Sequence, residues 1–223
     1  MEGILPVDVA VEALLAIGGI LVLCMSVAVR DGCFAWTAHR LGDSSAKLLG
    51  RVTLNPAKHL DLFGTILLPL ALLFATGLAF GCGRVMPLQA YRLRRPSRDI
   101  FIVAIAGPLA SLTIALGLAL VLLLSSRFDL LRPDNLGYLF LMQAIWTNVL
   151  LCLVHLVPLP PLDASRLLSH FLPPRIRLSF DSIGMYGMLL FIALFFSPFG
   201  AVLKEETESL PVWFRLVAQL VIP

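Results

Sequence analysis

Charged residues are scarce in this chain. Asp, Glu, Lys and Arg make up 14% of its 223 residues, and 59% are hydrophobic, whereas a soluble domain carries about 25% charged residues. This shortage excludes an ordinary soluble domain and predicts a protein that crosses a membrane several times. The formal net charge is only +3. The basic residues stand between apolar runs, which favours the lipid bilayer over nucleic acid as the partner.

Clustered cysteines are also missing. The chain has four cysteines, which are Cys24, Cys33, Cys82 and Cys152. Each lies in or beside an apolar run, far from the others, so neither a disulfide framework nor a metal knuckle is indicated. Lys and Arg are absent before Arg30. The first apolar run therefore lacks the basic start of a signal peptide, and we expect it to be a membrane helix.

The apolar runs predict one all-α polytopic membrane domain over 1–223. A spanning helix needs about 20 apolar residues, and four runs satisfy this, at about 9–40, 100–124, 136–158 and 182–203. The uncharged run 62–82 is interrupted by glycine and proline, which favours a re-entrant hairpin buried against protein. The stretches 51–54 and 85–93 predict two short β-strands, and 210–222 predicts an interfacial helix.

The distribution of Lys and Arg favours the re-entrant hairpin over a spanning one. If 62–82 crosses the membrane, the basic residues divide almost equally between the two faces. If it is re-entrant, most of them gather on one face, as the positive-inside tendency requires. We therefore expect a multi-pass protein of the bacterial cytoplasmic membrane with its N-terminus outside. Arg30 and Asp163 then lie on the cytoplasmic side.

Four sequence blocks carry a family resemblance when they are taken in order. They are Arg40–Leu41–Gly42–Asp43, Phe63–Gly64–Thr65–Ile66–Leu67–Leu68–Pro69, Ala106–Gly107–Pro108–Leu109 and Pro158–Leu159–Pro160–Pro161–Leu162–Asp163. Each block is weak alone. Together, over about 30–190, they resemble the site-2 protease family, the intramembrane zinc metalloproteases.

The resemblance implies a core of three helices that holds zinc near the cytoplasmic face. Two ligands come from the His residues of an HExxH motif, whose Glu activates the zinc-bound water, and the third ligand is the Asp of an LDG motif. Counting back from the first block, the HExxH window falls on Arg30, Asp31, Gly32, Cys33 and Phe34. Arg30 and Phe34 thus stand at the two His positions. Asp31 stands at the position of the general base, and Asp163 matches the third ligand.

This replacement of both His residues leaves three hypotheses open. The first is a catalytically inactive homologue without zinc, in which Arg30 pairs with Asp163, Asp31 or both, and which binds transmembrane segments of partner proteins. The second is an active zinc metalloendopeptidase whose site is rebuilt from His155, Asp163 and either Cys33 or His39. The third is a small transporter or channel, which the scarcity of ionisable groups after residue 100 disfavours.

Three further polar residues have expected roles. Asn148 interrupts an apolar run, and it either hydrogen-bonds a substrate strand or makes a helix–helix contact. His59 and His170 lie in polar connectors, where we expect them to be solvated.

Overall fold

The computed structural model describes residues 6–67, 69–70, 83–132 and 135–184. Three long helices dominate this part of the chain: α1 (Pro6–Arg40), α4 (Pro96–Arg127) and α5 (Leu136–His155). The shorter helices are α2 (Ser45–Leu48), α6 (Asp163–Phe171) and α7 (Pro174–Ile183). Single turns complete it, namely the 3₁₀ turns η1 (Pro56–Lys58) and η3 (Ala90–Arg92) and the π-helical turn η2 (Leu62–Leu67).

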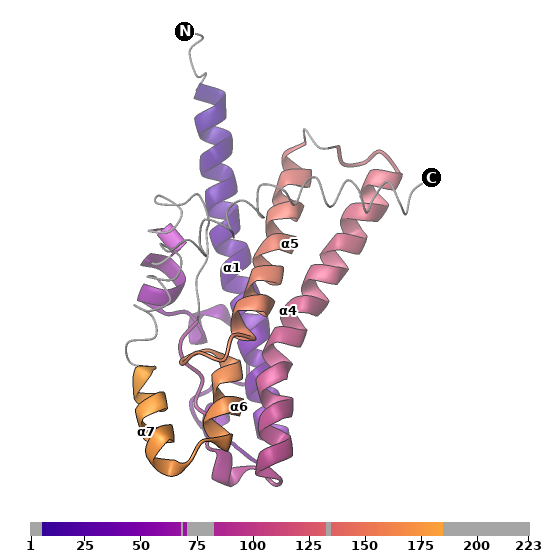
Figure 1. Cartoon of the computed structure of the whole chain (residues 1–223). Helices are drawn as coiled ribbons and strands as arrows, with labels where there is room; N and C mark the ends of the chain where they lie inside the picture. Colours follow the sequence, from indigo (N-terminus) through magenta and orange to yellow (C-terminus); the bar gives the residue numbers. More distant parts are fainter. Residues whose placement is uncertain (1–5, 68, 71–82, 133–134, 185–223) are drawn as a thin grey trace.

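The three long helices pack side by side as a bundle (Figure 1). Helix α4 runs antiparallel to α1, and α5 returns beside both. Helices α6 and α7 lie at the lower end of the bundle, where α1 ends. The segments Leu14–Arg40, Pro96–Arg127 and Leu136–His155 are each long and apolar enough to cross a membrane. The predicted helices at 9–40, 100–124 and 136–158 are therefore confirmed as helices.

Local sequence signals explain where the helices begin. Pro96 stands at the first position of α4, where its missing N–H costs no hydrogen bond. The Asp99 carboxylate in the same turn accepts from the backbone N–H of Arg95 at 2.8 Å. Asn135 caps α5 by accepting from the N–H of Gly137 at 2.8 Å. These caps place both helix starts without tertiary help.

Several predicted elements lie outside the described residues. These are the span at 182–203 beyond residue 184, the interfacial helix at 210–222 and most of the re-entrant run 62–82. The start of that run forms η2.

The two predicted β-strands, 51–54 and 85–93, are not confirmed. Within the described ranges neither stretch is a strand, and residues 90–92 form η3 instead. Arginine side chains bind backbone carbonyls that the hydrogen bonds of a β-sheet would use. Arg51 Nη1 donates to Val85 O at 2.7 Å, and Arg166 Nη2 donates to Met86 O. The 83–89 segment is thus anchored by guanidinium groups.

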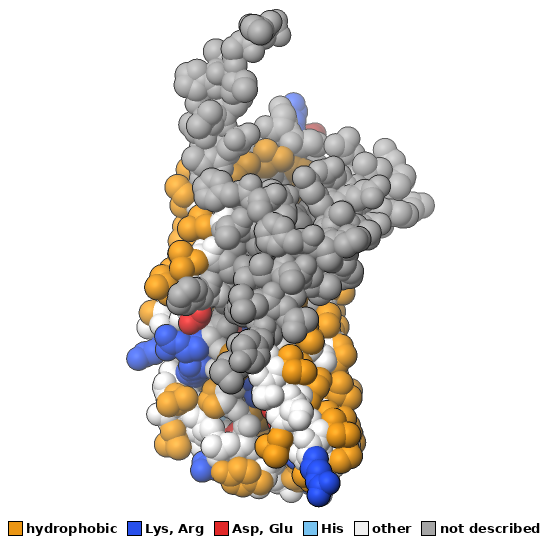
Figure 2. All heavy atoms as spheres, turned by 60° about the vertical axis from the view of Figure 1, so that its left-hand side comes forward, with side chains coloured by type: hydrophobic (Ala, Val, Ile, Leu, Met, Phe, Trp, Pro, Cys, Tyr) orange, Lys and Arg blue, Asp and Glu red, His pale blue; other side chains and the backbone are white. Residues whose placement is uncertain are grey.

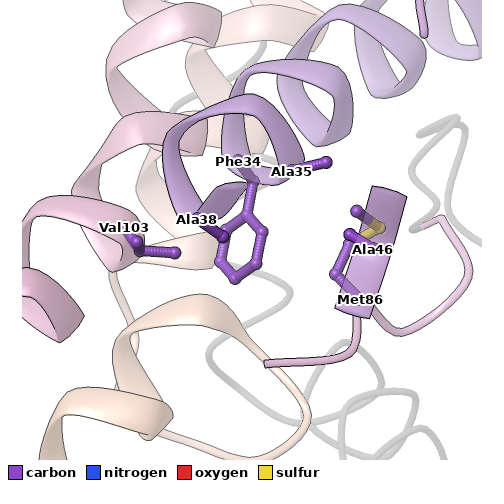
Figure 3. Packing of buried hydrophobic residues seen from close by; sticks show 6 residues of the cluster. All are labelled: Phe34, Ala35, Ala38, Ala46, Met86 and Val103. Carbon is purple, nitrogen blue, oxygen red and sulfur yellow. The ribbon is translucent and has the colours of Figure 1, made fainter. Parts of the chain in front are cut away.

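A small hydrophobic cluster fills the lower end of the bundle beside the last turns of α1. Its members are Phe34, Ala35, Ala38, Ala46, Met86 and Val103 (Figure 3). The three residues of α1 include two alanines, whose small side chains let the neighbouring segments approach closely. The Phe34 ring extends between the α4 side, where Val103 lies, and the Ala46 and Met86 side.

A buried carboxylate closes the turn after α1. Gly42 has φ +119°, a left-handed conformation that side chains disfavour, and the chain then reverses. The Asp43 carboxylate is fully buried and accepts from the N–H groups of Ser45 at 2.9 Å and Gln89 at 2.7 Å. Asp43 therefore joins the end of α1 to a segment that lies more than forty residues later in the sequence.

Candidate functional site

The HExxH window lies on the lower third of α1. Arg30, Asp31 and Phe34 have at most 4% of their surface exposed. Residues four apart in a helix share one face, so Arg30 and Phe34 point the same way. This is the geometry that the two His ligands of a zinc helix would need, but here it presents a cation and an aromatic ring.

The Arg30 guanidinium bridges two carboxylates. Its Nη1 donates to Asp31 Oδ1 and its Nη2 donates to Asp163 Oδ2, and all three side chains are buried. The predicted ion pairs of Arg30 with Asp31 and with Asp163 are thus both confirmed. Asp163 is the first residue of α6. The guanidinium therefore joins α1 to α6 at the point where the resemblance places a metal.

Helix α4 packs against this ion pair at Gly107. A Cβ on Gly107 would lie 3.1 Å from Asp163 Oδ2 and 3.3 Å from Arg30 Cγ. These distances are tighter than ordinary van der Waals contact, so only glycine fits here without displacing the pair. The Gly107–Pro108 step of the α4 sequence thus has a packing role at the site.

A second guanidinium covers the other His position. The Arg166 guanidinium carbon lies 5.2 Å from the centroid of the fully buried Phe34 ring, within the range of a cation–π contact. Burial lowers the pKa of Arg166, and the nearby Asp163 carboxylate opposes this shift. Arg30 therefore stands at one of the two positions that the resemblance assigns to histidines, and Arg166 faces the other, at Phe34.

His155 is placed at the site, whereas Cys33 and His39 are not. His155 is 4% exposed and lines a cavity together with Arg30 and Asp163. Its Nδ1 lies 2.9 Å from the carbonyl of Leu151, which can only accept, so Nδ1 carries a proton. This contact does not involve the other ring nitrogen of His155, Nε2.

The other two candidate ligands face elsewhere. Cys33 lines a separate groove, which shares no residue with the His155 cavity. His39 bonds Ser44 Oγ through Nδ1 and Lys47 Nζ through Nε2, each at 3.1 Å. In the part of the chain that the structure describes, no three His, Cys, Asp or Glu residues are grouped to hold a metal ion.

The cavity itself is small. Its volume is about 40 Å³, and its lining includes Arg30, Asp31, His155, Asp163 and Arg166. This is room for a few water molecules. A catalytic zinc needs three protein ligands and an open position, but here a guanidinium already lies between the two carboxylates. The residues present do not fit zinc.

His59 is a site residue that sequence reasoning missed. The prediction that it is solvated is wrong, because the side chain is fully buried. Its Nε2 lies 2.9 Å from the carbonyl of Thr53, and its Nδ1 lies 3.7 Å from Asp31 Oδ2. Its connector looks polar because several of its residues, among them Asn55 and Lys58, are polar and exposed. The available signal in the sequence was the Asn55–Pro56 turn just before His59, which directs the chain back toward α1.

Asn148 makes a helix contact. It is fully buried, and its Nδ2 donates to Ser26 Oγ of α1 and to the carbonyl of Ala144, each at 2.9 Å. Of the two alternatives for this residue, the structure shows the helix–helix contact. His170 is half-buried and bonds Ser97 Oγ at 3.1 Å, far along α6 from the ion pair.

Comparisons with known proteins agree with the family resemblance. The chain is 35% identical over 186 residues to the protein named "Putative zinc metalloprotease YwhC" of Bacillus subtilis, which covers 82% of this chain and 81% of that protein. It is 28% identical to "Putative zinc metalloprotease Rip2" of Mycolicibacterium smegmatis, over 85% of this chain and 70% of that protein. The Rip2 protein of Mycobacterium tuberculosis is 26% identical over 88% and 72% of the two chains.

No family model matches the chain, and no solved structure matches it. The assignment therefore rests on the relatives and on the apolar helices. The identity to the Bacillus protein extends over four-fifths of both chains, and the three apolar helices are those of a membrane protein. The chain belongs to the site-2 protease family of membrane zinc metalloproteases.

Proposed function

We propose that this protein is a catalytically inactive member of its family, in which the Arg30 guanidinium takes the place of the zinc ion. The observation that carries the proposal is the bridge from Arg30 to both Asp31 and Asp163. A guanidinium has five N–H donors, no lone pair and a permanent positive charge. It supplies the cation that Asp163 needs and repels a second one.

The same bridge engages the carboxylate at the position of the general base. Asp31 Oδ1 accepts from Arg30, and the aspartate side chain is one methylene shorter than glutamate. A general base must reach the water that it activates, and a carboxylate held by arginine is a poor base. The site therefore lacks both parts of the hydrolytic chemistry, which are the metal that acidifies a water molecule and the general base that activates it.

The metal content of the purified full-length protein tests the proposal directly. We expect no stoichiometric zinc by plasma mass spectrometry, and no change in thermal stability on adding a chelator. Stoichiometric zinc that is lost in His155→Ala would overturn the proposal and support a rebuilt metalloendopeptidase. The placement of Cys33 and His39 away from the cavity argues against that alternative.

Restoring the motif gives a second test, in which Arg166 matters. The variant Arg30→His, Asp31→Glu, Phe34→His recreates the HExxH letters, but its second imidazole lies under the Arg166 guanidinium. We expect this triple variant to bind zinc weakly, and the addition of Arg166→Gln to increase the zinc content. Wild-type protein that holds as much zinc as the restored variant would contradict the proposal.

We also propose that the protein binds transmembrane segments of other membrane proteins. Support comes from its relatives, which are named as proteases and so must accept a polypeptide. A titration of a fluorescently labelled single-span peptide into vesicles that contain the labelled protein tests this. We expect saturable energy transfer, whereas transfer that only follows random mixing in the bilayer would contradict the proposal.

A further inference from the structure

An apolar groove lies beside α1, separate from the Arg30 cavity. Its volume is about 230 Å³, and its lining residues are Gly32, Cys33, Trp36, Val52, Thr53 and Leu54. Gly32 and Trp36 are four residues apart on α1 and share one helix face. The other wall is the 52–54 segment, which comes after α2. No residue of this groove lines the cavity around Arg30.

The close approach of the two walls depends on Gly32. A Cβ at this position would lie 2.9 Å from the backbone carbonyl of Thr53, so the 52–54 segment packs directly onto the helix backbone. The groove is open at its rim, where Trp36 is 52% exposed and Leu54 is 61% exposed. Both of these apolar side chains are therefore accessible from outside the bundle.

A cation lies against the Trp36 ring, which lines the groove. Arg40 follows Trp36 by one helical turn, its side chain is exposed, and its guanidinium carbon lies 5.1 Å from the centroid of the Trp36 ring. The acidic residue that follows, Asp43, is fully buried and accepts hydrogen bonds from Ser45 and Gln89. It therefore does not face Arg40 as a counter-ion.

These features lie near the end of a candidate membrane span. Arg40 is the last residue of the candidate span Leu14–Arg40, and tryptophan side chains are enriched at membrane–water interfaces. Lys and Arg side chains are numerous at this end of the bundle, and most of those visible in Figure 2 lie in its lower half. The groove thus lies beside the last turns of this candidate span.

From this geometry we propose that the groove is a binding site for an anionic phospholipid. One acyl chain lies along Val52, Leu54 and the Trp36 ring, and the phosphate binds the Arg40 guanidinium. An apolar groove with an exposed cation stacked on its Trp36 ring matches both chemical halves of such a lipid. The proposal does not depend on the chemistry at Arg30.

Native mass spectrometry of the full-length protein in detergent, with phosphatidylglycerol or phosphatidylcholine of equal chain length, tests the proposal. We expect preferential binding of phosphatidylglycerol. Arg40→Gln should lower this preference about fivefold, the equivalent of about 1 kcal/mol for one basic side chain near an anionic surface. The matched control is Arg127→Gln, an exposed arginine at the far end of α4, which should keep the wild-type preference.

Alkylation of Cys33 in the unmodified protein is a second measurement. Cys33 lines the groove, and Cys24 on the same helix is the internal reference. We expect phosphatidylglycerol to slow the reaction of Cys33 with N-ethylmaleimide, followed by peptide mass spectrometry, more than phosphatidylcholine does. Equal effects of the two lipids would overturn the proposal. The proposal would also be overturned if glycerol phosphate, which lacks the acyl chains, protected Cys33 equally well. The same holds if a single-span peptide protected Cys33 and the lipids did not.

Discussion

An arginine buried between helices needs carboxylate partners, because a charge in an apolar region is stable only when it is paired and hydrogen-bonded. Arg30 has two such partners, Asp31 on its own helix and Asp163 on α6. Removing one partner from a buried ion pair is more costly than the pair itself is stabilising, since the remaining charges are left without compensation. The ion pair is therefore the most sensitive point of the fold.

Arg30→Ala should lower the free energy of unfolding by about 3–5 kcal/mol, the usual cost of breaking a buried pair. The variant removes the guanidinium that bridges two buried carboxylates. Thermal unfolding in detergent measures the change, with Arg127→Ala as the control for an exposed arginine of a membrane helix. Equal transition temperatures for the two variants would mean that the ion pair does not stabilise the fold.

His59 supports the same cluster from the connector after α1. His59→Leu leaves the Thr53 carbonyl without its hydrogen bond and removes the ring beside Asp31 Oδ2. We expect a loss of about 1–3 kcal/mol, as for other buried polar groups left unsatisfied. The half-buried His170 is the matched control, and His170→Leu should change stability by less than about 0.5 kcal/mol. Similar losses for both variants would contradict the assigned role.

At the scale of elements, glycines on the long helices let neighbouring segments pack at backbone distance. Gly107 on α4 faces the Arg30–Asp163 pair, and Gly32 on α1 faces the Thr53 carbonyl. The helices themselves follow from sequence, because long apolar runs and the Asn135 and Pro96 start signals act locally. The predicted strands are not formed for a different physical reason: the guanidinium groups of Arg51 and Arg166 bind the carbonyls of Val85 and Met86, which a β-ladder would use.

Two glycine substitutions separate packing from helix propensity. Gly32→Ala places a Cβ 2.9 Å from the Thr53 carbonyl, and Gly117→Ala on α4 meets nothing within 4 Å. Overpacking costs about 1–3 kcal/mol, whereas alanine in an open helix position gains about 0.5–1 kcal/mol over glycine. We expect Gly32→Ala to lower and Gly117→Ala to raise the unfolding temperature. A stabilising Gly32→Ala would show that the 52–54 segment moves away freely.

At the scale of the whole molecule, the two ends of the helical bundle carry different basic residues. Exposed basic residues gather at the end of α1, among them Arg40, Lys47 and Arg94. Arg127 lies at the other end of α4. The positive-inside tendency predicts that the α1 end is cytoplasmic and the N-terminus outside.

Labelling with a membrane-impermeant maleimide tests this orientation in intact bacterial cells. Arg127→Cys should react from outside, and Lys47→Cys should react only after the cells are permeabilised. Both side chains are exposed, Arg127 at the end of α4 and Lys47 beside His39 in the last turn of the antiparallel α1. The unmodified protein, with its own cysteines, is the control. The reverse pattern would invert the topology and place Arg30 nearer the outer face.

The sequence by itself determined the membrane class, the three long helices and the family, because each follows from composition or from the order of local motifs. On the family resemblance it also predicted the replacement of both His ligands. It also pointed to the pairing of Arg30 with Asp31 and Asp163, since a lone buried cation is costly. Only the tertiary structure brought His59 against Asp31, Arg166 over Phe34, and the 52–54 segment against Gly32. These contacts join segments that are separated by connectors. Their positions depend on how the whole chain packs around α1, which no local pattern encodes.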